Sequence, residues 1–129
     1  MSDLQCPATF WLVSGPDGLD RVRSVLGAAR VAGIYAGPAA EALASTAAEE
    51  LGAPVHTTDE LAPLRPTEDA DAARARWRGA VEDVADLYRG ETVLLVGDAE
   101  SIGRVVSGTP ADVLRVEVDA DGWRVSEPG

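Results

Sequence analysis

The sequence predicts an α/β fold of three layers, in which helices cover both faces of a largely parallel sheet and an antiparallel C-terminal hairpin forms its edge. Short apolar segments alternate with segments of helical periodicity along most of the chain, and this alternation is typical of βαβ units. The last two apolar segments are separated only by a short turn rich in Asp and Gly. That spacing predicts the hairpin.

In the first half of the chain, most of the expected strands end at a small-residue turn and precede apolar residues at helical spacing. Leu19 and Val22 show this spacing in the first helix, and Gly52 favours a stop for the second. The expected elements are a strand at Thr9–Val13, a helix at Asp17–Arg30, a strand at Val31–Ala36, a helix at Pro38–Leu51 and a short strand at Pro54–His56.

In the second half, a proline-containing segment without periodicity, Thr57–Pro66, is expected to be a loop. The longest helix should follow, and its arginines at positions 74, 76 and 78 are expected on a solvated face with the acidic residues after them. The expected elements are a helix at Thr67–Tyr88, a strand at Thr92–Val96, a helix capped by Asp98 and running through Val106, and hairpin strands at Val113–Val118 and Trp123–Val125 joined by a turn at Asp119–Gly122.

Length and composition fit one domain spanning residues 1–129, since 46% of the residues are hydrophobic and no repeat is visible. The chain has 22 acidic and 11 basic residues, a formal net charge of −11. This acidity excludes nucleic acid and anionic membranes as expected partners. Without a signal-peptide pattern, we expect a cytoplasmic protein.

Two details of composition concern source and redox chemistry. Every basic residue is Arg, and Ala and Gly are abundant, which suggests a GC-rich bacterial genome. The single cysteine, Cys6, cannot form an internal disulfide and is expected to have no reactive role.

Three predicted strands end in small, polar turns. These turns are Ser14-Gly15, Gly37-Pro38 and Gly97-Asp98. Ligands of α/β proteins bind beyond the carboxyl ends of parallel strands, because helix N-termini and free backbone N–H groups converge there. We therefore expect a pocket at this edge of the sheet. The candidate ligand-binding residues are Ser14, Asp17, Glu41, His56, Asp98 and Glu100.

Over nearly the whole chain, these segments resemble the histidine phosphatase superfamily, also called phosphoglycerate mutase-like proteins. In that family the first strand ends in an Arg-His-Gly motif whose His is phosphorylated. Phe10–Asp17 occupies the matching place, with Ser14 where the Arg would be and Gly15 where the His would be. The closing hairpin around Gly122-Trp123 also resembles the family's final strands. The resemblance implies a compact phosphoglycerate mutase-like fold.

The other two turns resemble the family's framework but carry different functional side chains. The family's second strand runs into a Ser-Ser-Pro-Leu-x-Arg-Ala pattern, which the segment Ile34–Ala47 resembles. Pro38 and Ala42 match this pattern, whereas Glu41 replaces the phosphate-binding Arg. The family's fourth strand ends in Ser-His-Gly, and here Asp98 stands in place of that second His.

These replacements determine the function that we expect. Phosphoryl transfer to an enzyme nucleophile needs an activated His, cations around the transferred group and a proton donor. The former catalytic positions hold Ser14, Gly15, Glu41 and Asp98. We therefore expect a pseudoenzyme without phosphatase or mutase activity, which uses no cofactor and binds a protein partner or a small polar or cationic ligand. The alternative is a repurposed enzyme, for example in specialised metabolism, in which the acidic residues act as acid or base.

Two other arrangements of the same residues are chemically sensible. Ser14, His56 and Asp98 would form a nucleophile system if His56, the single His of the chain, lay at the same end of the sheet. Asp17, Glu41, Asp98 and His56 have suitable ligand types for a divalent metal. Neither set has the spacing of a known motif, so no metal is predicted. In the simplest interpretation, Asp17 and Asp98 are helix N-caps and Glu41 complements a helix dipole.

The three tryptophans have different expected places. Trp11 lies in a buried strand and Trp77 on an apolar helical stripe, so both are expected in the core. Trp123 belongs to the terminal edge strand, which makes it the best candidate for a protein interface. The oligomeric state is left open.

Overall fold

The computed structural model describes residues 7–26, 30–106, 112–119 and 122–126. The predictions for Cys6, for the end of the first helix at residues 27–29 and for the hairpin turn at residues 120–121 lie outside the described residues. All the other predicted strands and helices are present, with small differences at their ends.

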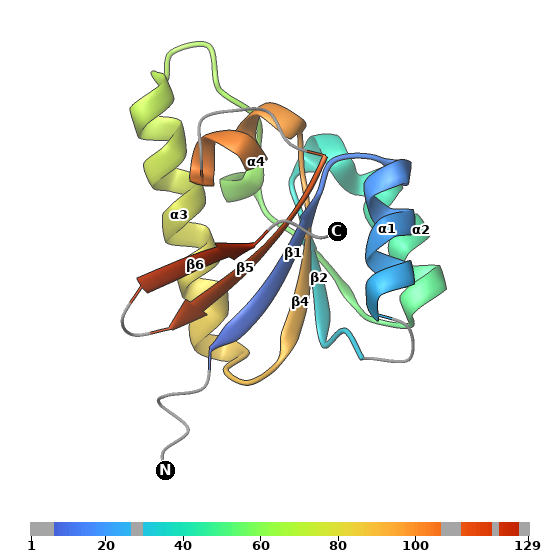
Figure 1. The fold of residues 1–129 in the computed structure, drawn as a ribbon. Coiled ribbons are helices and arrows are strands. Elements are labelled where there is room, and N and C mark those ends of the chain that lie inside the picture. Colours follow the sequence, from blue (N-terminus) through green and yellow to red (C-terminus); the bar gives the residue numbers. More distant parts are fainter. Residues whose placement is uncertain (1–6, 27–29, 107–111, 120–121, 127–129) are drawn as a thin grey trace.

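A six-stranded sheet forms the centre of the fold, in the order β3-β2-β4-β1-β5-β6 (Figure 1). The strands are β1 (Ala8–Val13), β2 (Gly33–Ala36), β3 (Val55–Thr57), β4 (Thr92–Val96), β5 (Val113–Asp119) and β6 (Gly122–Ser126). The first four strands of the sheet order, β3, β2, β4 and β1, are parallel. β5 pairs antiparallel with β1, and β6 pairs antiparallel with β5. The predicted α/β class and the antiparallel C-terminal hairpin are therefore confirmed.

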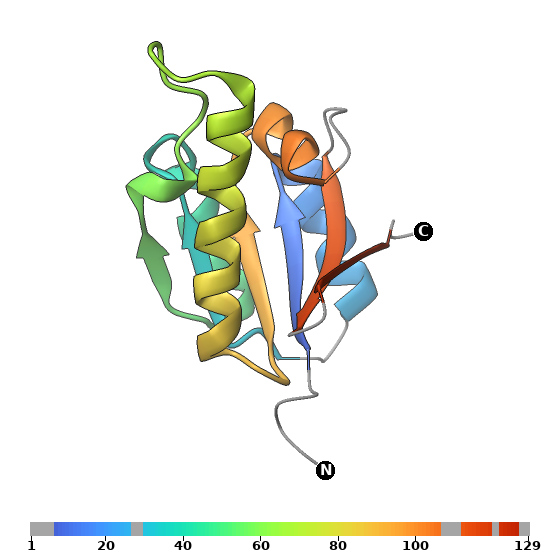
Figure 2. The ribbon, with the colours of Figure 1, turned by 90° about the vertical axis from the view of Figure 1, so that its left-hand side faces the viewer.

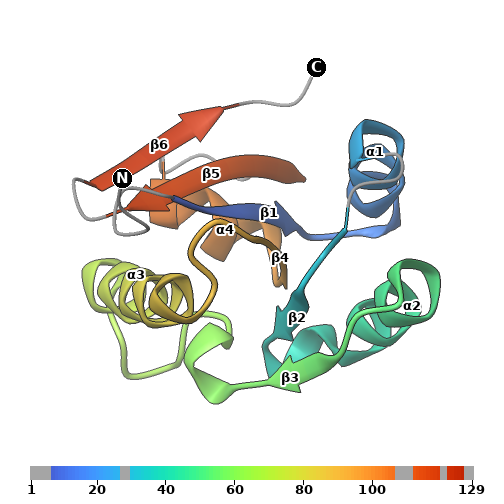
Figure 3. The ribbon, with the colours of Figure 1, turned by 90° about the horizontal axis from the view of Figure 1, so that it is seen from below.

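Helices cover both faces of this sheet. They are α1 (Pro16–Leu26), α2 (Glu41–Leu51), α3 (Ala70–Leu87) and α4 (Ala99–Val106), with short 3₁₀ helices at Pro38–Ala40 and Asp59–Leu61. α1 and α2 lie on one face and α3 and α4 on the other (Figure 3). Within the part of the chain that the structure describes, no helix combines the length and the apolar character needed to cross a membrane.

Alternation along β1 divides the core into two halves, because successive strand residues point to opposite faces. Phe10 and Leu12 pack in the cluster that contains Trp77 of α3. Trp11 and Val13 pack in the cluster beneath α1 and α2. Trp11 is 4% exposed and Trp77 is 1% exposed, so both tryptophans lie in the core as predicted.

The predicted solvated arginine face of α3 is wrong for two of its three members. The Arg76 side chain is only 12% exposed and pairs with Glu68 at 2.7 Å. Arg78 is half-buried and donates a hydrogen bond to the backbone carbonyl of Val105 in α4, at 3.0 Å. Both residues are next to the buried Trp77 in the sequence. The segment before α3 covers Arg76, and α4 covers Arg78. The periodicity of α3 alone contains no information about these neighbours.

Trp123 of β6 is half-buried against α3. Its indole N–H donates to the carboxylate of Glu82 at 3.0 Å, and the Arg78 guanidinium lies 4.1 Å from the ring centroid, which is a cation–π distance. Figure 2 shows α3 in front of the sheet, between the β3 edge and the β6 edge. The contacts of Trp123 in the structure are thus with its own chain, and its role in an interface stays a prediction.

Candidate functional site

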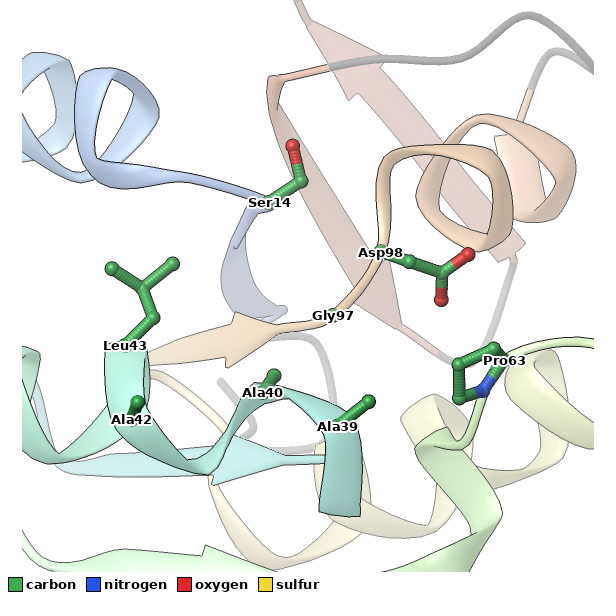
Figure 4. Close-up of a pocket in the computed structure, with 8 residues that line it drawn as sticks. All are labelled: Ser14, Ala39, Ala40, Ala42, Leu43, Pro63, Gly97 and Asp98. Atoms are coloured by element: carbon green, nitrogen blue, oxygen red, sulfur yellow. The ribbon is translucent and has the colours of Figure 1, made fainter.

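A pocket of about 330 Å³ lies at the carboxyl ends of β1 and β4, beside the start of α2 (Figure 4). It is lined by Ser14, Ala39, Ala40, Ala42, Leu43, Pro63, Gly97 and Asp98. Figure 4 shows Asp98 and Pro63 on one side of the pocket and Ser14 and Leu43 on the other. Among these lining residues, Asp98 carries the single ionisable side chain. The pocket therefore lies at the edge of the sheet that the sequence predicts, and its wall is mostly apolar.

Two glycines allow the turns around this pocket to pack closely. A Cβ atom on Gly97 would overlap the ring of Trp77, and a Cβ atom on Gly37 would overlap the backbone carbonyl of Leu61. The Trp77 indole N–H in turn donates to the carbonyl of Ala62 at 2.9 Å. The turn after β4 and the segment around residues 61–63 are thus held against the same tryptophan.

Asp98 connects the end of β4 to the start of α4. Its Oδ2 atom accepts a hydrogen bond from the Ser101 backbone N–H at 3.1 Å, and its backbone carbonyl accepts from the Ile102 N–H at 3.1 Å. These are the bonds of a helix N-cap, so the N-cap interpretation is confirmed for Asp98. It is wrong for Asp17, which lies inside the first turn of α1, because that helix already begins at Pro16. The second carboxylate oxygen, Oδ1, is buried and has no hydrogen-bond partner among the described residues.

The other three predicted carboxylates lie at helix starts and do not line the pocket. Asp17 is in the first turn of α1, Glu41 is the first residue of α2, and Glu100 is in the first turn of α4. All three are exposed. At these positions a negative charge complements the helix dipole. The short 3₁₀ helix brings Ala40 to the pocket and the first turn of α2 brings Ala42, while the Glu41 side chain between them is exposed.

His56 lies in the edge strand β3 and does not line the pocket. Its ring stacks on Tyr35, with the centroids 4.8 Å apart. The Tyr35 hydroxyl is 3.3 Å from the Tyr88 hydroxyl, and burial, followed by this hydrogen bond, raises the pKa of Tyr35 to about 12. The pocket therefore contains Ser14 and Asp98 but not the imidazole that a nucleophile system would need.

The structure also bears on the metal hypothesis. Within residues 7–26, 30–106, 112–119 and 122–126, no group of three or more His, Cys, Asp and Glu side chains is arranged to hold a metal ion.

Gly15 stands at the position of the family's nucleophile. It is half-buried, and a Cβ atom there would have no neighbour within 4 Å. Gly15 also lacks a positive φ angle. The backbone at this position can therefore accept a side chain, although the sequence supplies none.

Sequence reasoning missed the residues that form the apolar wall of the pocket. The helix that the sequence predicts after Gly37-Pro38 contains Ala39, Ala40 and Leu43, so their position at the start of that helix was the signal that could have found them. Pro63 could not be placed in this way, because it lies in a segment without periodicity and is fixed by Arg76 from a distant helix. The sequence gives no local signal for this contact, because Glu68 and Arg76 are 8 positions apart, which is not a spacing at which helix side chains pair.

Comparison with solved structures identifies the fold. YhfR of Bacillus stearothermophilus superposes with a TM-score of 0.73 at 18% identity, covering 95% of this chain and 96% of that protein. Phosphoglycerate mutase of Plasmodium falciparum gives a TM-score of 0.70 at 15% identity, with 97% and 92% covered. A mycobacterial hydrolase gives 0.65 at 12% identity, with 94% and 96% covered.

These similarities show that the chain has the fold of the phosphoglycerate mutase-like histidine phosphatases. At such low identity they show the fold alone. No protein-family model matches the sequence, and no curated protein matches it significantly. The fold implied by the sequence resemblance is thus confirmed, and the function must be inferred from the site.

Proposed function

We propose that this protein acts by binding a small ligand in the pocket between β1, β4 and α2, and that it has no phosphatase or mutase activity. The observation that carries this proposal is the composition of the pocket wall. Its described lining consists of small and apolar residues, one hydroxyl group at Ser14 and one carboxylate at Asp98. Neither His, Arg nor Lys is among these lining residues.

Electrostatics makes a phosphate group a poor ligand here. Two like unit charges about 4 Å apart repel by about 4 kcal/mol at an effective dielectric constant of about 20. A phosphate dianion near Asp98 would meet this repulsion or more. Helix N-termini stabilise an anion by only about 0.3–1 kcal/mol each, so the helices that begin at this edge cannot offset it.

Nucleophilic chemistry is also unsupported by the arrangement. Gly15 stands where the resemblance places the phosphorylated His, and glycine has no side chain to phosphorylate. Ser14 lies in the pocket with Asp98, but His56 is stacked on Tyr35. A serine that is not activated by an imidazole is a weak nucleophile at neutral pH. A binding function requires none of these missing groups.

The pocket has suitable dimensions for a small ligand. Ligand sites occupy about 300–1,000 Å³ and combine a mostly apolar wall with a few polar groups. The pocket is at the lower end of this range, at about 330 Å³, and it has the same kind of wall. The ligand should therefore be compact.

The test combines an activity assay with a binding assay. We expect no turnover of p-nitrophenyl phosphate and no phosphohistidine after incubation with phosphorylated metabolites. In NMR fragment screening, the protein should bind compact fragments, and Ala42→Leu, which narrows the pocket, should remove that binding. Ala75→Leu makes the same change at an exposed position of α3 and should leave it intact. Turnover that Asp98→Asn abolishes, or fragment binding that Ala42→Leu does not affect, would overturn the proposal.

A further inference from the structure

The two oxygens of the Asp98 carboxylate have different surroundings. Oδ2 caps α4 by accepting the Ser101 N–H. Oδ1 is buried without a hydrogen-bond partner in the described structure. The hydroxyl of Ser101, a residue only 1% exposed, is likewise buried without a partner. Buried polar atoms in folded proteins are nearly always satisfied, and these two lie together at the start of α4, one in its N-cap residue and one in its first turn.

Arg76 interacts electrostatically with Asp98 but cannot satisfy Oδ1. The hydrogen bond to Glu68 is the main cause that raises the pKa of Arg76, and the negative charge of Asp98 adds to it. A guanidinium has five N–H donors, and all five are used by the side chain of Glu68 and the backbone carbonyls of Glu60, Ala62 and Pro63. Arg76 could bind Asp98 only by releasing one of these acceptors.

We propose that the pocket binds a small alkylammonium ligand, with the protonated amine on Asp98 Oδ1 and a short alkyl group against the apolar wall. This inference rests on the proposed binding function and names its ligand class. A carboxylate with a free oxygen prefers a charged donor, because charge-assisted hydrogen bonds are about twice as strong as neutral ones. Ala39, Ala40 and Leu43 provide apolar contacts for the alkyl group.

The charge of the whole protein favours the same class of ligand. The chain has a formal net charge of −11, so its field attracts cations and repels anions. Figure 4 shows the Asp98 carboxylate directed toward Pro63. Since Oδ1 is shielded from solvent, the segment around Pro63, which Arg76 holds through the Pro63 carbonyl, must shift outward for the ammonium group to bind. The backbone amide of Leu64 should therefore respond to binding together with that of Asp98.

The experiment compares three probes of nearly equal shape at neutral pH: isobutylammonium, isobutanol and isobutyrate. Each is titrated into ¹⁵N-labelled protein, and the amide signals of Gly97, Asp98, Ser101 and Leu64 are followed. We expect saturable shifts with isobutylammonium at millimolar concentrations, much weaker ones with isobutanol and none with isobutyrate. Sodium chloride at matched ionic strength controls for screening.

Substitution of Asp98 separates the charge from the helix cap. Asn is as good an N-cap as Asp, so Asp98→Asn keeps α4 while removing the carboxylate. It should weaken isobutylammonium binding by about tenfold or more. Asp83→Asn makes the same change in net charge on the exposed side of α3 and should have no effect.

The outcomes distinguish the inference from the proposed function. Equal effects of Asp98→Asn and Asp83→Asn, or shifts from isobutylammonium no larger than those from sodium chloride, would overturn the ammonium site. If isobutanol or other neutral fragments still bind, and Ala42→Leu removes their binding, the proposed binding function stands although the ammonium site does not. Isobutyrate binding stronger than isobutylammonium binding would contradict the inferred charge preference directly.

Discussion

The guanidinium of Arg76 holds the carboxylate of Glu68 through two hydrogen bonds, of 2.7 and 2.9 Å. Its remaining donors bind the carbonyls of Glu60, Ala62 and Pro63 at 2.8–3.2 Å. One side chain of α3 thus fixes the segment that forms the Pro63 side of the pocket. The pocket wall depends on this ion pair, and the first two predictions follow from it.

Replacing Arg76 by Lys should lower stability and loosen the Pro63 wall. Lysine retains the positive charge, but its ammonium group has three donors and cannot reproduce the planar arrangement of five. We expect the thermal midpoint to fall by roughly 5 °C or more, and we expect faster amide exchange at residues 61–64. Arg74→Lys, at an exposed position two residues earlier, is the matched control. An unchanged midpoint in Arg76→Lys would show that the segment is held by other contacts.

The same ion pair predicts a dependence of stability on acid pH. Hydrogen bonding from Arg76 lowers the pKa of Glu68 from 4.5 to about 2. A carboxyl group whose pKa is lower in the folded state stabilises the protein above its unfolded pKa, and this contribution is lost as the pH falls toward the folded value. Between pH 4.5 and about 2, wild-type protein should therefore lose more stability than Glu68→Gln.

Urea unfolding at neutral pH and at several pH values in this window measures the effect. Glu68→Gln should be less stable than wild type at neutral pH, and the difference should shrink steadily toward pH 2. Glu49→Gln removes an exposed carboxylate from α2 and controls for the change in net charge. Parallel stability curves for wild type and Glu68→Gln would mean that the ion pair does not form in solution.

Two glycines at the same edge of the sheet should respond differently to substitution. Gly97→Ala places a methyl group into the ring of Trp77, and such overpacking destabilises proteins by about 1–3 kcal/mol. Gly15→Ala meets no atom within 4 Å and needs no positive φ, so it causes no overlap and should cost less stability than Gly97→Ala. Any loss should be the small one of replacing Gly by Ala just before a helix. Denaturant unfolding gives both values. Equal stability of the two variants would indicate that the turn after β4 does not contact Trp77.

Much of this fold is encoded in local patterns of the sequence. Apolar runs such as Val93–Val96 form strands buried on both faces, and their bounds follow from the turn residues beside them. Gly52 ends α2 in a left-handed conformation with φ of 69°, as predicted, because glycine adopts this conformation without steric cost. Asp98 caps α4 for an equally local reason, a side-chain bond to an N–H three residues ahead.

The sequence also located the pocket but not its complete wall. Ser14 and Asp98 follow parallel neighbouring strands, and the ends of such strands meet at one edge of a sheet. The sequence was less informative about which carboxylates line the pocket. A position in the first turn of a helix does not determine whether its side chain faces the pocket or the solvent. Of the four acidic candidates, only Asp98 lines the pocket, while the three others are exposed.

What the sequence alone determined, therefore, was every property set by neighbours within a few residues: strand and helix order, caps, turns and the edge of the sheet that carries the pocket. Only the tertiary structure decided which side chains contact across long separations. It paired Arg76 with the carbonyls of Glu60, Ala62 and Pro63. It also placed Arg78 over Trp123 and stacked His56 on Tyr35 instead of bringing it to Ser14. Such contacts depend on how whole elements pack, and the periodicity of a single element carries no record of its neighbours.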